Sequence, residues 1–466
     1  MGLSSLANAT ASVLLALVST AATARAAGPV CSPLAYGAVG DGVTDNTVAI
    51  QSAIDGCEAT YGGGVVRISA EPGKSTYLTG PIRLANHIRL QLDKGVTLRA
   101  TTDHSKYRTA SIKSPFHANE ALISAYKAID TGIIGPGTID GQGGIPTPDG
   151  GSSWWKLSRV PDASMPSPWL IEFYQCTGVT VNDVTLTNAP MWNLVLRYSR
   201  YITVSELSVT VTPVPLIADT DGIDVVGSSD ATLIFLNINS GGDSIALKSG
   251  LPPGPNEPGL PQQPTHDIQI VNSRFSNGNG IVVGEAANGV YNVMATNITA
   301  TNTTHGLQIK ADRTAANQAT GDYNILMQNM TLMDVKQPLA IGADDRSGED
   351  RSDPHAAVMS NIHDITVSGM TATNSGSAGF IAGLPESCIR NVTLSNVNIA
   401  TSGTGLELRN MTGTLTNVTI SSSGPPFVVQ RNVHVMAAGG TPAITNSPPD
   451  SVTQPRELPC GGNPEN

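Results

Sequence analysis

One short pattern of apolar and polar positions recurs along the chain from residue 179 onward. Its unit is apolar-x-apolar-x-x-apolar-x-apolar, shown first by Val179, Val181, Val184 and Leu186. Each apolar pair alternates as in a β-strand, and the two-residue break predicts a corner. Later copies begin at Ile202, Ala231, Ile268, Val293, Ile325, Ile365, Val392 and, weakly, Gly413. The steps of roughly 21 to 40 residues are typical of a solenoid with loops.

Strands this short cannot bury their apolar faces alone, so the repeats must stack and share one core. Neighbouring strands would then lie about 4.8 Å apart. A β-sandwich is the alternative all-β fold, but it requires hairpin dipeptides between antiparallel strands, and few occur here. The pattern therefore predicts an all-β parallel β-helix, formed by a single domain over residues 31–423.

Asparagine recurs at the corner of the repeat, four residues past its start. Five coils have it, at Asn272, Asn297, Asn329, Asn396 and Asn417. Asparagine tolerates left-handed backbone geometry, and stacked amides can hydrogen-bond from coil to coil. Three of these residues also stand in glycosylation sequons, which an asparagine followed by strand threonine produces by coincidence. We favour the structural interpretation over glycosylation.

Both ends of the expected β-helix differ from its middle. Residues 44–54 place apolar side chains at helical spacing after polar capping residues, which predicts a short helix covering the open end of the solenoid. Residues 1–26 combine a short apolar stretch with small-residue cleavage sites, so we expect a signal peptide and an extracellular, secreted protein. Residues 424–466 are rich in Pro and Gly and lose the period, which predicts an irregular tail.

Composition narrows the possible partners. Charged residues make up 14% of the 466, and the formal net charge is −11. Without a basic stripe, this balance argues against a nucleic-acid partner. No segment approaches the twenty or so apolar residues of a membrane helix, and no Cys/His cluster has metal-ligand spacing. We therefore expect no membrane partner, no metal and no cofactor, and the covered ends favour a monomer.

Five cysteines fit an exported protein. Cys31 and Cys57 bracket the first segment after the expected signal peptide, and a bond between Cys388 and Cys460 would tie the tail to the last coils. Four cysteines allow three connectivities, so these pairs are one hypothesis among three. Cys176 is then left over, and we interpret it as a small buried apolar residue.

Several motifs in a fixed order link the chain to a known family. They are Tyr-Gly-Ala-Val-Gly-Asp-Gly-Val-Thr-Asp at 36–45, Ile-Asp-Gly-Gln-Gly at 139–143 with Trp154 and Trp155, and Thr-Asn-Ala-Pro-Met-Trp at 187–192. Together they resemble the polygalacturonases, the family 28 glycoside hydrolases that cleave pectin. The likeness thins toward the C-terminus, where only the coil pattern persists. It implies a right-handed parallel β-helix with a groove for a pectic polysaccharide along one face.

The catalytic signature of that family reads Asn-Thr-Asp, Gly-Asp-Asp, Gly-His-Gly and Arg-Ile-Lys. The matching segments here are Asp-Thr-Asp at 219–221, Gly-Gly-Asp at 241–243, Gly-Asn-Gly at 278–280 and Gln-Ile-Lys at 308–310. The flanking residues match as well, among them Gly-Ile-Asp ending at Asp224. Each of the four motifs has therefore lost one member, and the chain diverges from the family at its catalytic positions.

The resemblance makes Asp221 and Asp243 the pair that activates water. Inverting hydrolysis also needs a protonated carboxyl that donates to the leaving oxygen. The family has this acid at the position of Gly242, and glycine cannot transfer a proton. The histidine that sets the environment of the acid is replaced by Asn279, which can hydrogen-bond but not titrate.

Asp219 is one candidate for a replacement acid. It stands where the signature has asparagine, and on a β-strand it would share a face with Asp221. Two carboxylates that close cannot both ionise freely, so the pKa of one should rise, as a general acid requires. Under the alternative interpretation, Asp219 only binds a sugar hydroxyl.

The Arg and Lys of the last motif imply a grip on the galacturonate carboxylate. Gln308 keeps a donor but loses the charge, whereas Lys310 keeps one point charge. Arg313 would substitute if its loop folds inward. We expect these three residues and Asn279 to bind substrate, and the reduced charge makes a branched or less charged pectic sugar plausible.

Several other residues have two interpretations each. Trp154, Trp155 and Trp192 either stack on sugar rings or anchor the packing. His305 is either a groove histidine or a polar corner residue, and the acidic residues 344–350 favour a solvated loop over a cation site.

Three functional hypotheses remain open. The first is a secreted hydrolase that cleaves galacturonosyl linkages in pectin, or in a related polysaccharide, with inversion. The second is a catalytically impaired relative that binds the polymer without hydrolysing it. The third is a β-helix lyase, which needs Ca²⁺ held by carboxylates and a basic residue. It is the weakest, because the aspartates follow hydrolase spacing.

Overall fold

The computed structural model describes residues 28–114, 117–158, 167–211, 219–250, 263–284, 289–311, 321–343, 361–385, 387–440 and 460. The expected signal peptide, residues 1–26, lies outside the described residues.

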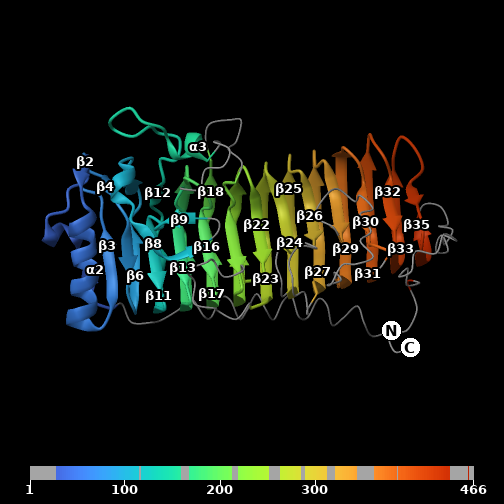
Figure 1. Ribbon diagram of the computed structural model, residues 1–466, viewed down its shortest axis with the longest axis horizontal. Coiled ribbons are helices and arrows are strands. Elements are labelled where there is room, and N and C mark those ends of the chain that lie inside the picture. The colour runs from blue at the N-terminus through green and yellow to red at the C-terminus, as the bar shows by residue number, and fades with distance from the viewer. Residues whose placement is uncertain are drawn as a thin grey trace.

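The described chain is a right-handed parallel β-helix, which confirms the predicted fold class. Its coils stack along the long axis of the molecule, as Figure 1 shows. Two long parallel sheets make up the coils, one with 21 strands and one with 12 among the described residues. The apolar side chains of both sheets point inward and form one continuous core.

The 12-stranded sheet takes one short strand from each coil. Its strands are β5 (Ile82–Leu84), β10 (Ile123–Tyr126), β13 (Ile171–Tyr174), β16 (Leu194–Arg197), β19 (Ile223–Val226), β22 (Asp243–Lys248), β24 (Asn279–Gly284), β26 (His305–Lys310), β28 (Gln337–Gly342), β30 (Gly379–Ala382), β32 (Leu406–Arg409) and β34 (Phe427–Val429).

The 21-stranded sheet holds the repeating unit found in the sequence. Its strands are β1 (Val30–Cys31), β2 (Asp41–Asp45), β3 (Gly64–Ile68), β4 (Thr76–Thr79), β6 (Ile88–Leu92), β7 (Thr97–Ala100), β11 (Ile129–Ile134), β12 (Thr138–Asp140), β14 (Thr177–Asn182), β15 (Thr185–Thr187), β17 (Arg200–Ser205), β18 (Ser208–Thr210), β20 (Ser229–Ile234), β21 (Asn237–Asn239), β23 (Thr265–Ser276), β25 (Val290–Thr301), β27 (Tyr323–Met333), β29 (His363–Ser375), β31 (Ile389–Thr401), β33 (Met411–Ser421) and β35 (Val433–Gly440).

The register of this sheet confirms the repeat. Each predicted repeat start pairs with the next one along the chain, from Val179 opposite Ile202 to Val392 opposite Gly413. The predicted corner is also present, because β20 and β21 both pair with the single long strand β23. In each repeat, one apolar pair therefore points into the core before the corner and the other pair does so after it.

The corner asparagines form the predicted ladder. All five have positive φ, between 50° and 57°. The Nδ2 group of Asn297 donates to Oδ1 of Asn272 at 2.9 Å, Asn329 donates to Asn297 at 3.3 Å, and Asn417 donates to Asn396 at 3.1 Å. These amides stabilise the stacking of the coils, as the structural interpretation requires.

A helix covers the N-terminal end of the stack. The predicted helix over 44–54 is present as α2 (Thr47–Tyr61), which lies against the first coils beside the short helix η1 (Pro33–Tyr36) (Figure 1). The disulfide Cys31–Cys57 joins α2 to β1. The remaining elements are η2 (His104–Lys106), α3 (Trp154–Leu157) and the antiparallel pair β8 (Thr109–Ser114) and β9 (His117–Asn119).

At the C-terminal end the β-helix continues past the predicted boundary. Strands β34 and β35 lie within the segment 424–466 that we expected to be irregular, and they pair with β32 and β33. That part of the prediction was wrong, since regular structure reaches Gly440. Pro425 and Pro426 lie in the loop between two strands, where the carbonyl of Pro426 accepts the N–H of Leu406 at 2.9 Å.

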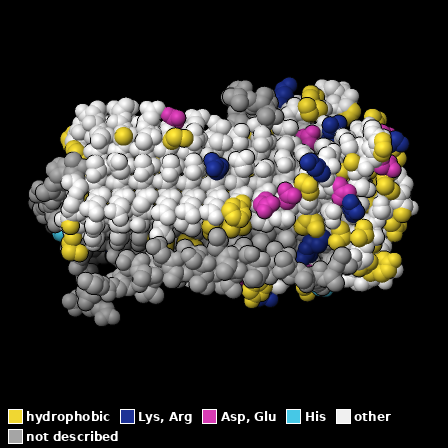
Figure 2. All heavy atoms as spheres, turned by 180° about the vertical axis from the view of Figure 1, so that it is seen from behind, with side chains coloured by type: hydrophobic (Ala, Val, Ile, Leu, Met, Phe, Trp, Pro, Cys, Tyr) yellow, Lys and Arg dark blue, Asp and Glu magenta, His cyan; other side chains and the backbone are white. Residues whose placement is uncertain are grey.

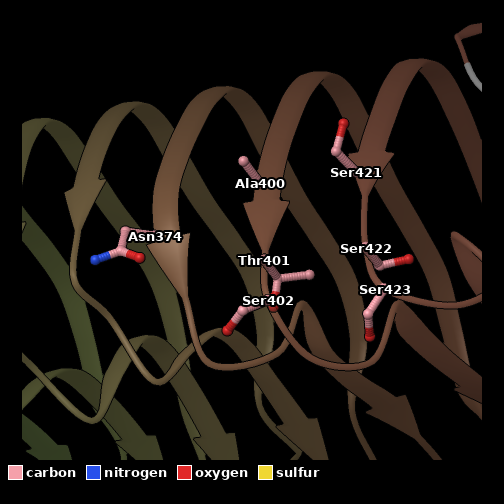
Figure 3. Close-up of a pocket in the computed structure, with 7 residues that line it drawn as sticks. All are labelled: Asn374, Ala400, Thr401, Ser402, Ser421, Ser422 and Ser423. Atoms are coloured by element: carbon pink, nitrogen blue, oxygen red, sulfur yellow. The ribbon is translucent and has the colours of Figure 1, made fainter.

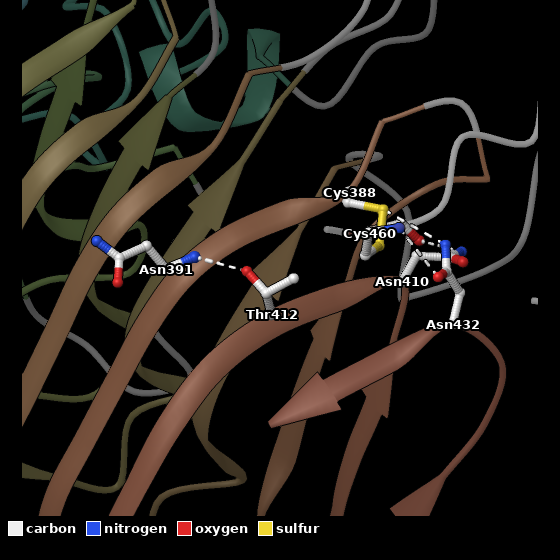
Figure 4. The surroundings of a disulfide bond; sticks show 7 residues. Cys388, Asn391, Asn410, Thr412, Asn432 and Cys460 are labelled. Carbon is white, nitrogen blue, oxygen red and sulfur yellow. Dashed lines mark hydrogen bonds between the residues drawn. A yellow bond between two sulfur atoms is a disulfide. The ribbon is translucent and has the colours of Figure 1, made fainter. Parts of the chain in front are cut away.

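A second disulfide fixes the end of the chain to the last coils. Cys388 is bonded to Cys460, as predicted, and Figure 4 shows buried asparagines around the bond. Oδ1 of Asn432 accepts the N–H of Cys460 at 3.0 Å. The remaining cysteine, Cys176, is fully buried, and burial raises the pKa of its thiol to about 11. It is a buried core residue, as interpreted from the sequence.

Charge is unevenly spread over the surface. On the face seen in Figure 2, the charged side chains gather toward the N-terminal coils, and the described part of the later coils shows mainly uncharged polar groups and backbone. None of the described helices has the length and apolar character needed to cross a membrane.

Candidate active site

The signature residues lie on, or just before, neighbouring strands of the 12-stranded sheet. Strands β19, β22, β24 and β26 are consecutive neighbours there. Within β22, Ile245 and Leu247 belong to the core, so Lys248 points outward by alternation. Asp243 lies opposite Asn279 on the next coil, and Lys310 lies one further strand along. Four segments far apart in the sequence are thus neighbours on consecutive coils.

Asp221 and Asp243 lie together on adjacent coils. The N–H of Asp243 donates to Oδ1 of Asp221 at 2.8 Å. The backbone of the next residue strengthens this contact, because the N–H of Gly222 donates to the carbonyl of Asp243 at 2.8 Å. The residues remain 6% and 8% exposed, respectively, so both carboxyls are largely removed from water without being sealed off.

Lys248 is the cationic partner of this carboxyl cluster. Its Nζ lies 2.9 Å from Oδ1 of Asp224 and 3.6 Å from Oδ2 of Asp221. The ammonium also lies 4.0 Å from the ring centre of Trp192, a cation–π distance. Trp192 in turn stacks on Trp169, with ring centres 5.1 Å apart. Two buried aromatic rings therefore hold the lysine beside the aspartates.

The environment of Asp221 disfavours the charged form of its carboxyl. Burial raises the pKa of its carboxyl well above the ordinary value, and the negative charges of Asp224 and Asp243 raise it further. Lys248 and the N–H of Asp243 act in the opposite direction but do not cancel these effects. A buried carboxyl between two others is best accommodated when it keeps its proton.

Asp243 has a different partner. The Nδ2 group of Asn279 donates to its Oδ1 at 2.8 Å, and Asn279 is fixed in turn by Ser244, whose Oγ donates to the Asn279 carbonyl at 2.7 Å. A donor facing a carboxylate oxygen favours its ionised form. Asn279 thus hydrogen-bonds at this site without titrating.

Asp219 does not lie on a strand, and that part of the prediction was wrong. It has positive φ, 59°, and is exposed in the turn that precedes β19. The alternation that would have put it on the same face as Asp221 therefore does not apply. The neighbouring carboxyls that perturb Asp221 are Asp224 and Asp243 instead.

The predicted substrate-binding residues lie on β26. Gln308 and Lys310 are partly exposed and alternate with buried Leu307 and Ile309, so they face outward. Arg313 lies outside the described residues, as does the acidic segment 344–350.

His305 begins β26, one strand beyond Asn279, and pairs with Gln337 on the following coil. Burial and the charges of Lys310 and Lys336 lower its pKa to about 4. The imidazole is therefore neutral near pH 7 and can accept or donate one hydrogen bond in the row that contains Asp243 and Asn279.

The tryptophans named from the sequence are packing residues. Trp154 is buried and stacks on His104, and Trp155 is buried with its Nε1 donating to the Ala189 carbonyl at 2.8 Å. Asn193, which follows Trp192, is fully buried and donates to the Asp221 carbonyl at 2.9 Å. These contacts leave none of the three tryptophan rings open for a sugar to stack on.

Two charged residues of this cluster, Asp224 and Lys248, were not among the predicted site residues, and Asp224 counted only as a flanking match to the family motif. Asp224 and Lys248 are the sole charged residues of β19 and of the last five positions of β22, and both are buried. Lys and Asp are almost never fully buried unless paired. A charge within an otherwise apolar strand was the signal that would have identified them.

A surface depression elsewhere does not belong to this site. It has a volume of about 450 Å³ and lies on the last coils (Figure 3), lined by Asn374, Ala400, Thr401, Ser402, Ser421, Ser422 and Ser423. Two of its hydroxyls already donate to backbone carbonyls of Gly403 and Gly424, at 3.0 and 2.8 Å. No group of three or more His, Cys, Asp or Glu arranged to hold a metal occurs among the described residues.

Comparisons with known proteins identify the family of the chain. The profile of glycosyl hydrolases family 28 matches residues 65–423. An endo-polygalacturonase of Pectobacterium carotovorum subsp. carotovorum is 34% identical over 278 residues, which are 58% of this chain and 65% of that protein. The chain thus matches less than two thirds of the length of that relative.

Solved structures show the same fold. The polygalacturonase from Erwinia carotovora ssp. carotovora superposes with a TM-score of 0.65 at 26% identity, over 88% of this chain and 98% of that one. An exopolygalacturonase from Thermotoga maritima superposes with a TM-score of 0.65 at 20% identity, over 88% and 92% of the two chains. The latter likeness supports the fold alone.

Proposed function

The chain belongs to glycosyl hydrolase family 28, and we propose that it hydrolyses galacturonosyl linkages in pectin or a related pectic polysaccharide with inversion. The observation that carries this proposal is the contact of Asp221 with Asp243 on adjacent coils, where both residues keep a small exposed fraction. Inverting hydrolysis needs two such carboxyls, one protonated and one ionised. The opposed environments of Asp221 and Asp243 supply that difference.

Recognition of the sugar falls to the residues around this pair. Lys310 supplies a point charge for a uronate carboxylate, Gln308 supplies an uncharged amide, and Asn279 lies beside the proposed base. His305, neutral near pH 7, offers a hydrogen bond to a sugar hydroxyl in the same row. Asp219, exposed at the edge of the cluster, accepts from a sugar hydroxyl rather than donating the catalytic proton.

The test is the release of new reducing ends from polygalacturonic acid and from branched pectic polymers. We expect the wild-type chain to release them and Asp243→Asn to lower kcat by at least about 100-fold. Asp230→Asn is the matched control, since Asp230 is exposed on β20 in the other sheet. Proton NMR of the first product reports its anomeric configuration, and retention would contradict an inverting mechanism.

One observation favours a second candidate, an impaired relative that binds pectic polymer. Position 242, where the family has its acid, is glycine. This alternative predicts retention of the chain on immobilised polygalacturonate together with no reducing ends above those of Asp243→Asn. Turnover that depends on Asp243 would exclude it.

Export is a separate part of the proposal. Two disulfides at opposite ends of the β-helix support an oxidising compartment, where such bonds persist. Expression of the full chain in a secreting host should yield protein in the medium whose N-terminus lies shortly after residue 26. Retention of the full-length chain inside the cells would contradict it.

A further inference from the structure

Among the described residues, the site brings three carboxyls together with one ammonium group. Asp221 and Asp224 lie beside the ammonium group of Lys248, whose closest oxygen is Oδ1 of Asp224 at 2.9 Å, and the charge of Asp243 acts on Asp221. With all three carboxyls ionised, the buried cluster would carry a net charge of about −2, which a low-dielectric site disfavours. Asp221 interacts with both other carboxyls. It is therefore the member that keeps a proton at the lowest cost.

Glycine at position 242 bears directly on where this carboxyl lies. A Cβ atom built on Gly242 would overlap Oδ1 of Asp221 and fall 3.1 Å from its Cγ. A side chain at 242 and the present position of the Asp221 carboxyl therefore exclude one another. The space beside residue 242 is occupied by a carboxyl after all, supplied by the adjacent coil.

Hydrogen bonding gives the two oxygens of Asp221 different roles. Oδ1 accepts the N–H of Asp243 at 2.8 Å, so it is not the protonated atom. Oδ2 lies 3.6 Å from Nζ of Lys248, beyond ordinary hydrogen-bond distance, and can carry the proton. Oδ1 of Asp243 accepts the amide N–H of Asn279 at 2.8 Å, an arrangement that suits a base.

We propose that Asp221 is the catalytic proton donor of this chain and that Asp243 alone is the base, an assignment that rests on the proposed function. It differs from the family resemblance, in which both residues activate water. The proton on Oδ2 of Asp221 passes to the glycosidic oxygen as the bond to the anomeric carbon breaks, and the bonding pair stays with that oxygen. Water attacks the anomeric carbon from the opposite side and gives its proton to Asp243.

The choice of leaving group in the substrate tests the acid, Asp221, separately from the base, Asp243. A substrate whose leaving group is already a stable anion needs no acid but still needs the base. We would compare polygalacturonic acid with an oligogalacturonide 2,4-dinitrophenyl glycoside. Asp221→Asn should lower kcat/KM on the polymer at least about 100-fold and on the aryl glycoside less than about tenfold. Asp243→Asn should lower both to a similar extent.

A second variant perturbs the acid without replacing it. Gly242→Ala adds a methyl group that displaces the Asp221 carboxyl, so polymer hydrolysis should fall at least about tenfold while the aryl glycoside is spared. Gly424→Ala is the matched control, because a Cβ there would meet nothing within 4 Å.

Three outcomes decide between the claims. Equal losses of Asp221→Asn on both substrates, or full polymer activity in that variant, would overturn the assignment of the acid and leave the proposed function standing. A folded wild-type chain that cleaves neither substrate would overturn the proposed function itself. Selective loss on the polymer in both Asp221→Asn and Gly242→Ala supports the assignment.

Discussion

Replacing Lys248 with methionine tests how the buried charges of the site are balanced. At an effective dielectric constant near 20, the attraction of the Lys248 ammonium to the Asp224 carboxylate across 2.9 Å is about 6 kcal/mol. Asp221, which keeps its proton, adds little to this attraction. Desolvation offsets part of this gain, but removing one partner leaves the other charges buried. The expected loss in free energy of unfolding is about 3–5 kcal/mol at pH 7. Methionine keeps an unbranched apolar side chain of similar length, so packing contributes little, although the ammonium that lies 4.0 Å from the Trp192 ring centre is lost.

The assay is equilibrium unfolding in urea, followed by circular dichroism at pH 7 and at pH 4. The deficit of Lys248→Met should shrink at pH 4, because a buried carboxyl that has lost its ammonium partner relieves its charge by taking up a proton, which a lower pH favours. The double variant Lys248→Met with Asp224→Asn should recover most of the loss at pH 7. A deficit below about 1 kcal/mol, or a double variant as unstable as the sum of its single changes, would refute the assigned charge balance.

The same variant has a second readout in the pH dependence of activity. Lys248 lowers the pKa of Asp221, so without it the carboxyl holds its proton to higher pH. If Asp221 is the acid, the alkaline limit of kcat/KM should move to higher pH in Lys248→Met. A shift to lower pH would contradict that role.

Three further predictions concern stability and the edge of the site. Burial raises the pKa of Asp322 to about 7, so the free energy of unfolding that this carboxyl contributes should fall as pH rises from about 4 to 7. Asp322→Asn keeps the acceptor for the N–H of Val290. In urea unfolding, this variant should be more stable than wild type by a few kcal/mol at pH 8 and equally stable at pH 4. Replacing Cys388 and Cys460 with serine should lower the free energy of unfolding by up to about 4 kcal/mol, since the bond closes a 72-residue separation, and equal urea midpoints would contradict this. Asp219→Asn should change kcat on polygalacturonic acid by less than about tenfold, and a larger loss with an altered pH profile would restore Asp219 as the acid.

The periodic part of the fold was predictable because each coil depends on its neighbours. A short apolar pair buries nothing alone, so its spacing in the sequence becomes the register in space, and Val179 pairs with Ile202 as the repeat requires. The C-terminal boundary was not predictable in this way. Pro425 and Pro426 read as the end of the pattern, yet the loop that holds them leads into β34, whose pairing with β32 is a tertiary contact.

The site was predictable in its members but not in their orientation. Asp221 and Asp243 were identified from motif and spacing, and the structure brings them within one hydrogen bond. Asp219 was placed on a strand by alternation, whereas the strand begins four residues later at Ile223. Residues i and i+2 share a face only inside a strand. The sequence did not show where β19 begins, so alternation could not place Asp219.

Gly242 changes in meaning once the volume around it is known. From the sequence it is a substitution that removes a carboxyl from the position where the family has its acid. In the structure the missing side chain and the Asp221 carboxyl compete for one space, so their effects cannot be separated. Restoring aspartate at 242 would therefore displace one carboxyl while adding another. The reaction of this site depends on which carboxyl fills that space and on which cation faces that carboxyl. The residue type at position 242 alone determines neither.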